Sequence, residues 1–385
     1  MLSSITIQSP ARPARIAVSA YFFSAGFCFA SWASRIPDIQ QKLSLNEAGL
    51  GMVLLSLPVG LMVSLPVSGF VVARYGSRYT AIIAALLYAM LLPFLGLVTL
   101  VWQLVVVLFL FGFAGNLLNI SMNTQGVGVE ALYGRSIMAS FHGVWSVAGF
   151  SGATIGTLML SLFISPFLHF CIIAILVCCL VIVAYKYLLV RDIHSDSKTP
   201  VFAKPDSALL KLGLIAFCCM VCEGTMFDWS GIYFVKVVEV PKSLTTLGYV
   251  AFMTTMAGGR FAGDWMSVKI GKRNMIRMSG LLIAGGLMLA VVLPYIVPAT
   301  IGFLITGMGV SSVVPLVYST AGKSGKVAAG VALAAVSTIG YLGFLFGPPA
   351  IGLIAQALSL RWSFALIAFL GLGVTLLAGF SKIED

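Results

Sequence analysis

Twelve long apolar stretches, falling into two halves that resemble each other, are the strongest feature of this sequence. Gly76 follows the second stretch and Gly271 follows the eighth, and these positions differ by 271 − 76 = 195. Gly112 in the fourth stretch and Gly307 in the tenth are separated by the same 195 positions. A fixed offset of this kind indicates a duplicated unit. Two six-helix repeats that handle a substrate between them are typical of secondary transporters.

The composition places most of the chain in a bilayer. Hydrophobic residues make up 60% of the 385 residues and charged residues 9%, and the mean hydropathy is +1.06. This is more apolar surface than a soluble domain can bury. A membrane-spanning helix needs about 20 mostly apolar residues. The expected spans are 16–34, 48–73, 79–99, 102–127, 139–163, 166–188, 208–229, 244–268, 275–297, 299–319, 327–355 and 362–380.

These spans predict an all-α membrane protein with twelve transmembrane helices in two pseudo-symmetric six-helix bundles. The first half is expected at 1–190 and the second at 208–385. A stretch rich in Lys, Asp, Ser and Pro, at 191–207, is expected to join them as a cytoplasmic linker.

The positive charges predict the orientation of the chain. The net charge of +11 does not indicate a nucleic-acid partner, because the basic residues gather in alternate loops. With the N-terminus inside, seventeen Lys and Arg residues lie on the inner side and five on the outer side. Cytoplasmic loops are enriched in Lys and Arg, so both termini are expected in the cytoplasm. The expected location is a bacterial inner (cytoplasmic) membrane.

The loop after the second span resembles a motif of the major facilitator superfamily. The family pattern is roughly Gly-x-x-x-Asp-Arg-x-Gly-Arg-Lys, and Gly69, Arg74, Gly76 and Arg78 match it, with Ala73 in place of the Asp. In the second half, Asp264 occupies the position of the first glycine. The segment 343–352 also looks like the Gly-x-x-x-Gly-Pro-x-x-Gly motif of this family.

A narrower resemblance is to a bacterial inner-membrane subgroup similar to fucose permease. The residues that carry it are Glu223-Gly224 with Asp228-Trp229 in span seven, Ser31-Trp32-Ala33-Ser34-Arg35 in span one, and Phe141-His142-Gly143 opening span five. The superfamily resemblance implies the major facilitator fold, with a substrate site near the midplane lined by spans one, four, seven and ten.

Two acidic residues in span seven are the candidate proton carriers. Ionisable groups in hydrocarbon are costly unless they are paired or hydrated, so they mark a cavity or a partner. Glu223 is expected either to load and release a proton or to form a permanent structural pair. Asp228 lies about 140° around an ideal helix from Glu223. Both can face one cavity only if the helix breaks near Gly224 or ends before Asp228.

The candidate gating residues are basic side chains near the span ends. Arg35 closes span one, and a pair with Asp228 or Glu223 would form an outer gate; an interfacial Arg hydrated by lipid headgroups is the alternative. Arg260 and Asp264 lie at i,i+4 in span eight, where a structural inner latch is favoured over substrate contact. The full gating set is Arg35, Arg74, Arg78, Arg260 and Asp264.

The candidate substrate-binding residues begin with a polar stripe on span four. Asn116, Asn119, Asn123 and Glu130 fall within roughly 60° on a helix. Amide side chains suit hydroxyl-rich solutes because each offers a donor and an acceptor, but Asn also joins helices within bundles. Both interpretations stay open. The full candidate set is Asn116, Asn119, Asn123, Ser311, Tyr318, Trp32 and Trp229.

The function expected from these patterns is secondary active transport by alternating access. Proton-coupled symport of a small polar solute, such as a sugar or related metabolite, comes first. The alternatives are proton-driven efflux of an amphipathic drug or metabolite and, from another class, a non-transporting membrane sensor. The expected partners are a small-molecule substrate, protons and the lipid bilayer, and the chain is expected to act as a monomer. No enzyme activity, metal or cofactor is expected.

Overall fold

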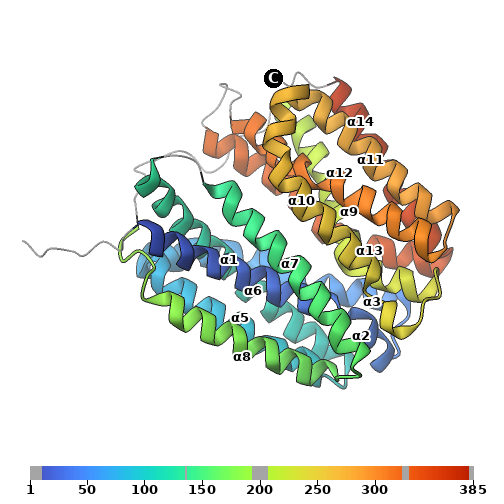
Figure 1. The fold of residues 1–385 in the computed structure, drawn as a ribbon, viewed down its shortest axis with the longest axis horizontal. Helices are drawn as coiled ribbons and strands as arrows, with labels where there is room; N and C mark the ends of the chain where they lie inside the picture. The colour runs from blue at the N-terminus through green and yellow to red at the C-terminus, as the bar shows by residue number, and fades with distance from the viewer. Residues whose placement is uncertain (1–10, 135–136, 193–206, 323–328, 381–385) are drawn as a thin grey trace, which may run out of the picture. The chain divides into compact units, whose positions relative to one another are not determined.

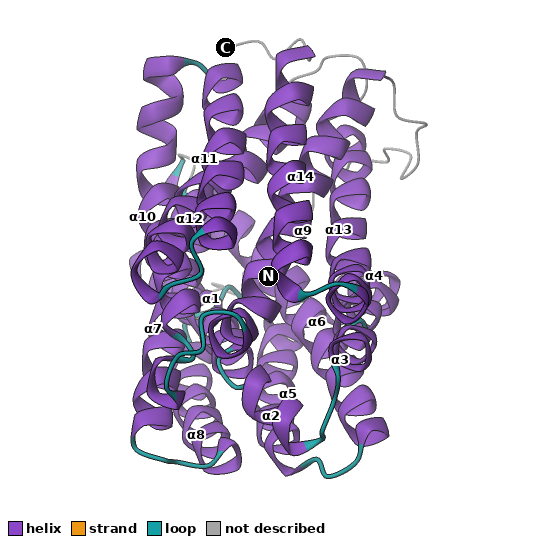
Figure 2. Cartoon of the chain, turned by 90° about the vertical axis from the view of Figure 1, so that its right-hand side faces the viewer, coloured by secondary structure: helices purple, strands orange, loops and turns teal. Residues whose placement is uncertain are grey.

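The computed structural model describes residues 11–134, 137–192, 207–322 and 329–380 (Figure 1). Figure 2 shows this part of the chain drawn as helices joined by loops. The elements, in chain order, are α1 (Ala11–Ala33), α2 (Ile36–Lys42), α3 (Glu47–Leu54), α4 (Ser56–Tyr75), α5 (Ser77–Leu97), α6 (Val101–Tyr133), α7 (Met138–Ser161), α8 (Pro166–Tyr185), α9 (Ser207–Lys236), η1 (Lys242–Leu244), α10 (Leu247–Ile270), α11 (Lys272–Val292), α12 (Ile296–Gly322), α13 (Ala329–Ala357) and α14 (Leu360–Phe380).

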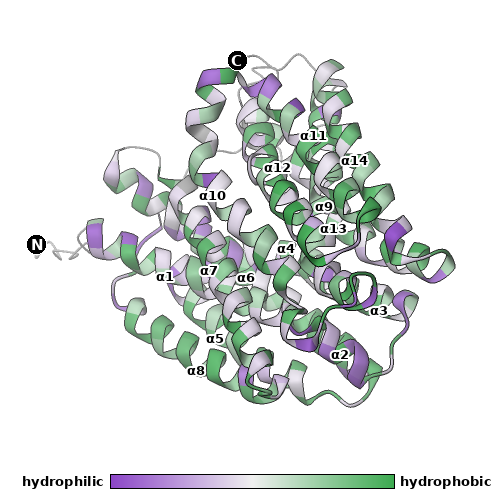
Figure 3. Ribbon diagram, turned by 45° about the vertical axis from the view of Figure 1, so that its right-hand side comes forward, coloured by the Kyte–Doolittle hydropathy of each residue, from purple (hydrophilic) through white to green (hydrophobic). Residues whose placement is uncertain are grey.

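The all-helical membrane fold expected from the sequence is confirmed. Within the described residues, eleven helical segments are long and apolar enough to cross a membrane, and α10, with 24 residues, is a further long helix. Figure 3 shows apolar residues along the lengths of the long helices and hydrophilic residues on the short α2. Helices satisfy all of their backbone hydrogen bonds internally, which hydrocarbon requires.

The helix boundaries repeat with the offset that the sequence indicates. Residues 77–97 form α5 and residues 272–292 form α11, so both ends of this helix pair are 195 positions apart. The same offset relates the first residues of α6 and α12 and the last residues of α8 and α14. The two halves therefore share the boundaries of these helices. They differ where the first half divides α1 from α2 and α3 from α4, since the corresponding parts of α9 and α10 are continuous.

The packing within each half repeats as well. A Cβ on Gly112 would collide with the backbone of Leu57 in α4, and a Cβ on Gly307 would collide with the backbone of Phe252 in α10. Leu57 and Phe252 are themselves 195 positions apart. Small residues let membrane helices approach closely without a hydrophobic driving force. Gly112 and Gly307 thus hold the same helix contact in each half.

The turn before the third long helix of each half also repeats. Gly76 has φ +82° and Gly271 has φ +80°, a left-handed conformation that L side chains rarely adopt. Arg78 then donates to the Tyr185 carbonyl at the end of α8, and Arg273 donates to the Ala378 carbonyl at the end of α14. These contacts explain why glycine and arginine recur at both positions.

The contacts divide the chain into two compact units. The first contains 1–32, 56–152 and 165–195, and the second contains 33–55, 153–164 and 196–385. The segments 33–55 and 153–164 come from the first half of the sequence but pack with the second half. Most of the expected linker, 193–206, lies outside the described residues.

Alanine at the two repeated glycines tests this packing. Gly112→Ala and Gly307→Ala should each destabilise the protein by about 1–3 kcal/mol, because a helix backbone must move to admit the methyl group. Thermal unfolding of the purified protein measures the effect. Gly69→Ala and Gly258→Ala are matched controls, since a Cβ at either position meets no atom within 4 Å. Equal melting temperatures for all four variants would show that the close contacts are unimportant.

Candidate functional site

An ion pair inside the second unit joins α9 to α10. The Arg260 guanidinium donates to Glu223 Oε1 at 3.2 Å, with side-chain exposures of 18% and 9%. Glu223 lies close to the middle of the 30-residue helix α9, so the pair sits at the depth of the hydrocarbon. A charged pair at this depth is costly to desolvate and is weak evidence for stability.

Three helices that pack against α9 carry tyrosines. Tyr249 lies in α10, Tyr318 in α12 and Tyr341 in α13, and each of these helices contacts α9, which carries Glu223. Cys219 and Cys222, about one turn or less from Glu223 on α9, are fully buried.

The first half of the chain serves as an internal comparison for this pair. The positions equivalent to Glu223 and Arg260 are Cys28 and Leu65. Cys28 is fully buried in α1, and the framework around it folds without a charge at that position. The shared fold therefore does not require the ion pair, and a function for it is favoured.

The helix that carries Glu223 does not break. Residues 207–236 form one continuous α-helix, and Gly224 lies in its interior against the ring of Phe344. Glu223 and Asp228 were expected to share a cavity only if this helix broke near Gly224 or ended before Asp228. With the helix intact, the two carboxylates lie on different faces of α9.

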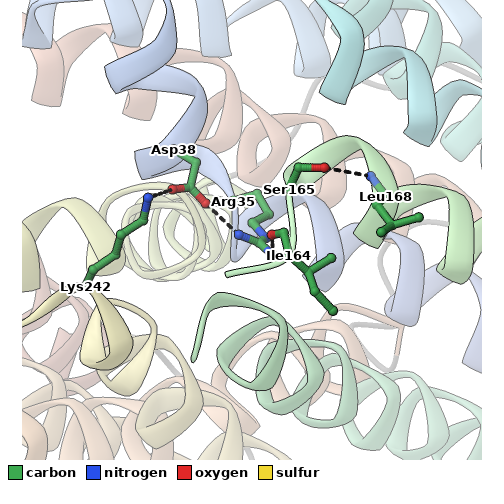
Figure 4. Close-up of polar contacts among 6 residues, drawn as sticks. All are labelled: Arg35, Asp38, Ile164, Ser165, Leu168 and Lys242. Carbon is green, nitrogen blue, oxygen red and sulfur yellow. Dashed lines mark hydrogen bonds and ion pairs between the residues drawn. The ribbon is translucent and has the colours of Figure 1, made fainter. Parts of the chain in front are cut away.

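A buried arginine organises the loops at the end predicted to face outward. Arg35 is 1% exposed and donates to Asp38 Oδ2 at 2.8 Å and to the Ile164 carbonyl at 2.9 Å (Figure 4). Lys242, in η1, pairs with Asp38 Oδ1 at 3.4 Å. We refer to Arg35, Asp38, Ile164 and Lys242 as the Arg35 cluster. It ties the segment after α1, the end of α7 and the α9–α10 loop together.

The expected Arg35 pair with Asp228 or Glu223 is therefore replaced by different pairs. Arg35 pairs with Asp38, three residues along the chain, and Glu223 pairs with Arg260. Since α1 ends at Ala33 and α2 begins at Ile36, the chain turns at Arg35. The turn directs the guanidinium toward α2 and the α7–α8 loop. If span one continued as a straight helix, the guanidinium would point elsewhere.

Further contacts close this end of the second unit. Lys236, the last residue of α9, forms an ion pair with Glu47, the first residue of α3. The hydroxyls of Thr157 and Thr246 are 2.5 Å apart. In each contact one residue comes from the first half of the sequence and one from the second, so the two halves are joined at this end.

Four residues in these contacts were not among the expected gating residues: Asp38, Glu47, Lys236 and Lys242. Their pairing has a signal in the sequence, because acidic residues occur in one predicted outer loop and basic residues in another. Which charges meet depends on the loop turns, which apolar periodicity does not predict.

The other gating candidates have separate positions. Arg74 is exposed, with its guanidinium 5.8 Å from the centre of the Tyr75 ring. Arg78 is 4.6 Å from the Tyr185 ring in addition to its bond with the Tyr185 carbonyl. The side chain of Asp264 lies outside what the structure describes, so the expected Arg260–Asp264 latch stays a prediction.

The residues of the polar stripe on α6 lie in the first unit and have different hydrogen-bond partners. Asn123 Nδ2 donates to Asn119 Oδ1 at 2.7 Å, so two of the amides bind each other along the helix. Asn116 is buried and donates to Ser68 in α4 at 3.4 Å. Glu130 accepts from the backbone N–H groups of residues 137 and 138 at the start of α7. Asn116 thus joins two helices, whereas Asn119 and Asn123 stay partly exposed.

The remaining substrate candidates lie mostly in the packed interior. Ser311 donates to the Met308 carbonyl within α12, and Tyr318 lies in the same helix, which packs against α9. Trp32 and Trp229 are 1% and 0% exposed, and within the described residues neither indole Nε1 has a hydrogen-bond partner. Asn116 and Ser311 are also equivalent positions of the repeat, 195 residues apart.

Comparison with known proteins identifies the family. The family model of the Major Facilitator Superfamily matches residues 17–341, which is most of the chain. The chain belongs to the Major Facilitator Superfamily. It is a membrane transporter of this type, and the superfamily resemblance of the Gly69–Arg78 loop is confirmed.

Relatives of this transporter extend over nearly its full length. It is 34% identical over 353 residues to an uncharacterised MFS-type transporter of Yersinia pestis, with 92% of each chain covered. It is 31% identical over 360 residues to membrane protein MosC of Rhizobium meliloti, covering 92% of this chain and 87% of that one.

Solved structures share the fold at low sequence identity. A bacterial homologue of the human lysosomal transporter Spinster, inward-facing and occupied, has a TM-score of 0.77 at 16% identity, with 94% of this chain and 95% of that chain covered. The nucleoside transporter NupG has a TM-score of 0.73 at 13% identity, with coverages of 95% and 98%. Identities this low establish the major facilitator fold and nothing about the solute.

The burial of Arg35 predicts unequal effects of two charge deletions. Arg35→Ala should destabilise this transporter by about 3 kcal/mol or more, because it leaves the Asp38 carboxylate and the Ile164 carbonyl without their buried donor. Lys236→Ala, which removes a more exposed partner, should cost about 1 kcal/mol or less. Thermal unfolding in detergent compares the two variants. Equal losses would contradict a structural role for the Arg35 cluster.

Proposed function

We propose that this transporter imports a small polar solute, such as a sugar or related metabolite, by proton-coupled symport. The two halves would alternate access to a site near the bilayer midplane. The observation that carries the proposal is the buried Glu223–Arg260 pair, which the equivalent positions of the first half do not contain. Intramembrane ionisable residues mark ion or substrate pathways.

The pair offers a direct way to couple a proton to a conformational change. A proton that binds a Glu223 carboxylate oxygen neutralises it and weakens its bond with Arg260. The Arg260 guanidinium can then form a stronger contact with another acceptor, such as a polar group of the solute. By linkage, a solute that changes the environment of this pair also changes its proton affinity by the same factor.

The closed end of the second unit supports alternating access. Opening it would require separation of Lys236 from Glu47 and of Lys242 from Asp38. Lys236 and Lys242 are 39% and 62% exposed, so these ion pairs contribute little and are easily broken. Weak contacts of this kind suit a gate, because the open and closed states must stay close in free energy.

A polar solute is preferred over an amphipathic one. Asn119 and Asn123 are only partly buried and offer amide groups to hydroxyl-bearing solutes. The resemblance to the subgroup similar to fucose permease supports a sugar-like compound. An amphipathic compound would need apolar side chains that it can contact. Phe22 in α1 and Met226 in α9 are candidates for such contacts, but both are fully buried in the packing. A non-transporting sensor would bind solute without accumulating it.

Glu223→Gln tests the proton step. The amide mimics the protonated carboxyl, so the variant should keep solute binding and exchange but lose accumulation driven by a pH gradient. Proteoliposomes with an internal pH-sensitive dye measure proton movement coupled to the solute. A panel of sugars and metabolites is screened first, and the solute that moves protons through the wild-type protein is then used for the variant.

Glu239→Gln is the matched control, because Glu239 is an exposed loop residue and its variant should accumulate normally. Undiminished gradient-driven accumulation by Glu223→Gln would remove Glu223 from the proton step.

A further inference from the structure

We propose that Asp228 and Tyr249 form a binding site for the protonated amine of an organic cation, an ammonium group carried by the transported solute. The inference rests on the proposed transport function, because the bound amine is taken to be part of the transported solute. Amine binding can nevertheless be measured without transport. It narrows the solute from a polar compound to one that bears a positive charge.

Asp228 is a carboxylate that the fold leaves uncompensated. It lies about 10 Å along the helix from the middle of α9, still within the outer part of the hydrocarbon. Within the described residues its carboxylate has no hydrogen bond and no ion pair. A charge at this depth needs a partner, because isolated ions in hydrocarbon are costly. Asp228 is half-buried, so a solute can reach it.

Tyr249 supplies a second, independent sign of a ligand. Its hydroxyl is buried at 2% exposure and has no hydrogen-bond partner among the described residues. Its ring packs against Phe227, the residue that precedes Asp228 on α9. Buried hydroxyls nearly always have a partner, so one without a partner beside an unpaired carboxylate indicates an absent group that binds both.

Tyr249 belongs to a small aromatic cluster in which Phe227 is the central ring. Phe227 packs edge-on against Tyr249, with ring centres 6.2 Å apart, and against Phe252, with ring centres 5.8 Å apart. Tyr249 is 2% exposed, so its hydroxyl lies within the packed fold and not in solvent.

The equivalent positions of the first half carry no polar group. The positions equivalent to Asp228 and Tyr249 are Ala33, at the end of α1, and Leu54, at the end of α3. Both are buried apolar residues, with exposures of 6% and 2%. The second half has thus placed a carboxylate and a phenol, on neighbouring helices, where the first half has two apolar side chains.

The donor set favours an ammonium group over other ligands. A neutral hydroxyl would leave the carboxylate charge uncompensated, and a hard metal cation takes six or more oxygen ligands. A protonated amine has several N–H donors, so it can neutralise Asp228 and also donate to the Tyr249 hydroxyl. Arg260 pairs with Glu223 and not with Asp228. A cation carried by the solute can therefore pair with Asp228.

Binding of matched amine and neutral probes tests the site. The full chain is purified in lipid nanodiscs, and its thermal stabilisation is measured with glucosamine against glucose and with ethanolamine against ethylene glycol, at equal ionic strength. We expect stabilisation by the two amines above that of their neutral partners. Asp228→Asn should weaken apparent amine affinity by about tenfold or more, and Tyr249→Phe by a smaller factor.

Two further variants keep the test decisive. Asp228→Glu retains the charge and should retain measurable amine preference, which shows that loss in Asp228→Asn does not reflect misfolding. Glu239→Gln changes an exposed loop residue and should bind the amines as the wild type does. Binding is measured without a pH gradient, so a failed proton-coupling experiment leaves this result independent. Equal stabilisation by amine and neutral probes, unchanged amine affinity in Asp228→Asn, or no stabilisation by either amine would overturn the proposal.

Discussion

Hydrocarbon offers no hydrogen-bond partners, and this constraint shapes every part of the molecule. The backbone must satisfy itself within helices, and the helices must pack through close contacts between small residues. Gly112 and Gly307 make such contacts against the backbones of Leu57 and Phe252, at equivalent positions of the two halves. The same glycine contact is thus present at equivalent positions of both halves.

Against this apolar framework, the charged groups of the second half stand out. Glu223 and Arg260 replace a cysteine and a leucine of the first half, and Asp228 and Tyr249 replace an alanine and a leucine. Buried ion pairs seldom contribute net stability. Comparison of the two halves of one chain therefore distinguishes residues that maintain the fold from residues that we assign to transport.

The sequence alone predicts the fold well and the charge partners poorly. Apolar runs and the 195-residue offset predict the long helices, because spanning a bilayer depends on length and composition. The partner of Arg35 depends on the turn between Ala33 and Ile36, which no periodicity predicts. Glu223 was singled out because acids in hydrocarbon are rare, but its pairing with Arg260, 37 positions away, requires the packing of α9 on α10.

The central claim is that the Glu223–Arg260 pair serves transport and not folding. The most direct measurement replaces both residues with their equivalents from the first half, in the double variant Glu223→Cys, Arg260→Leu. We predict a protein that unfolds at the wild-type temperature or above, yet shows no gradient-driven accumulation of solute in proteoliposomes. A double variant that fails to fold, or one that still accumulates solute, would contradict this account.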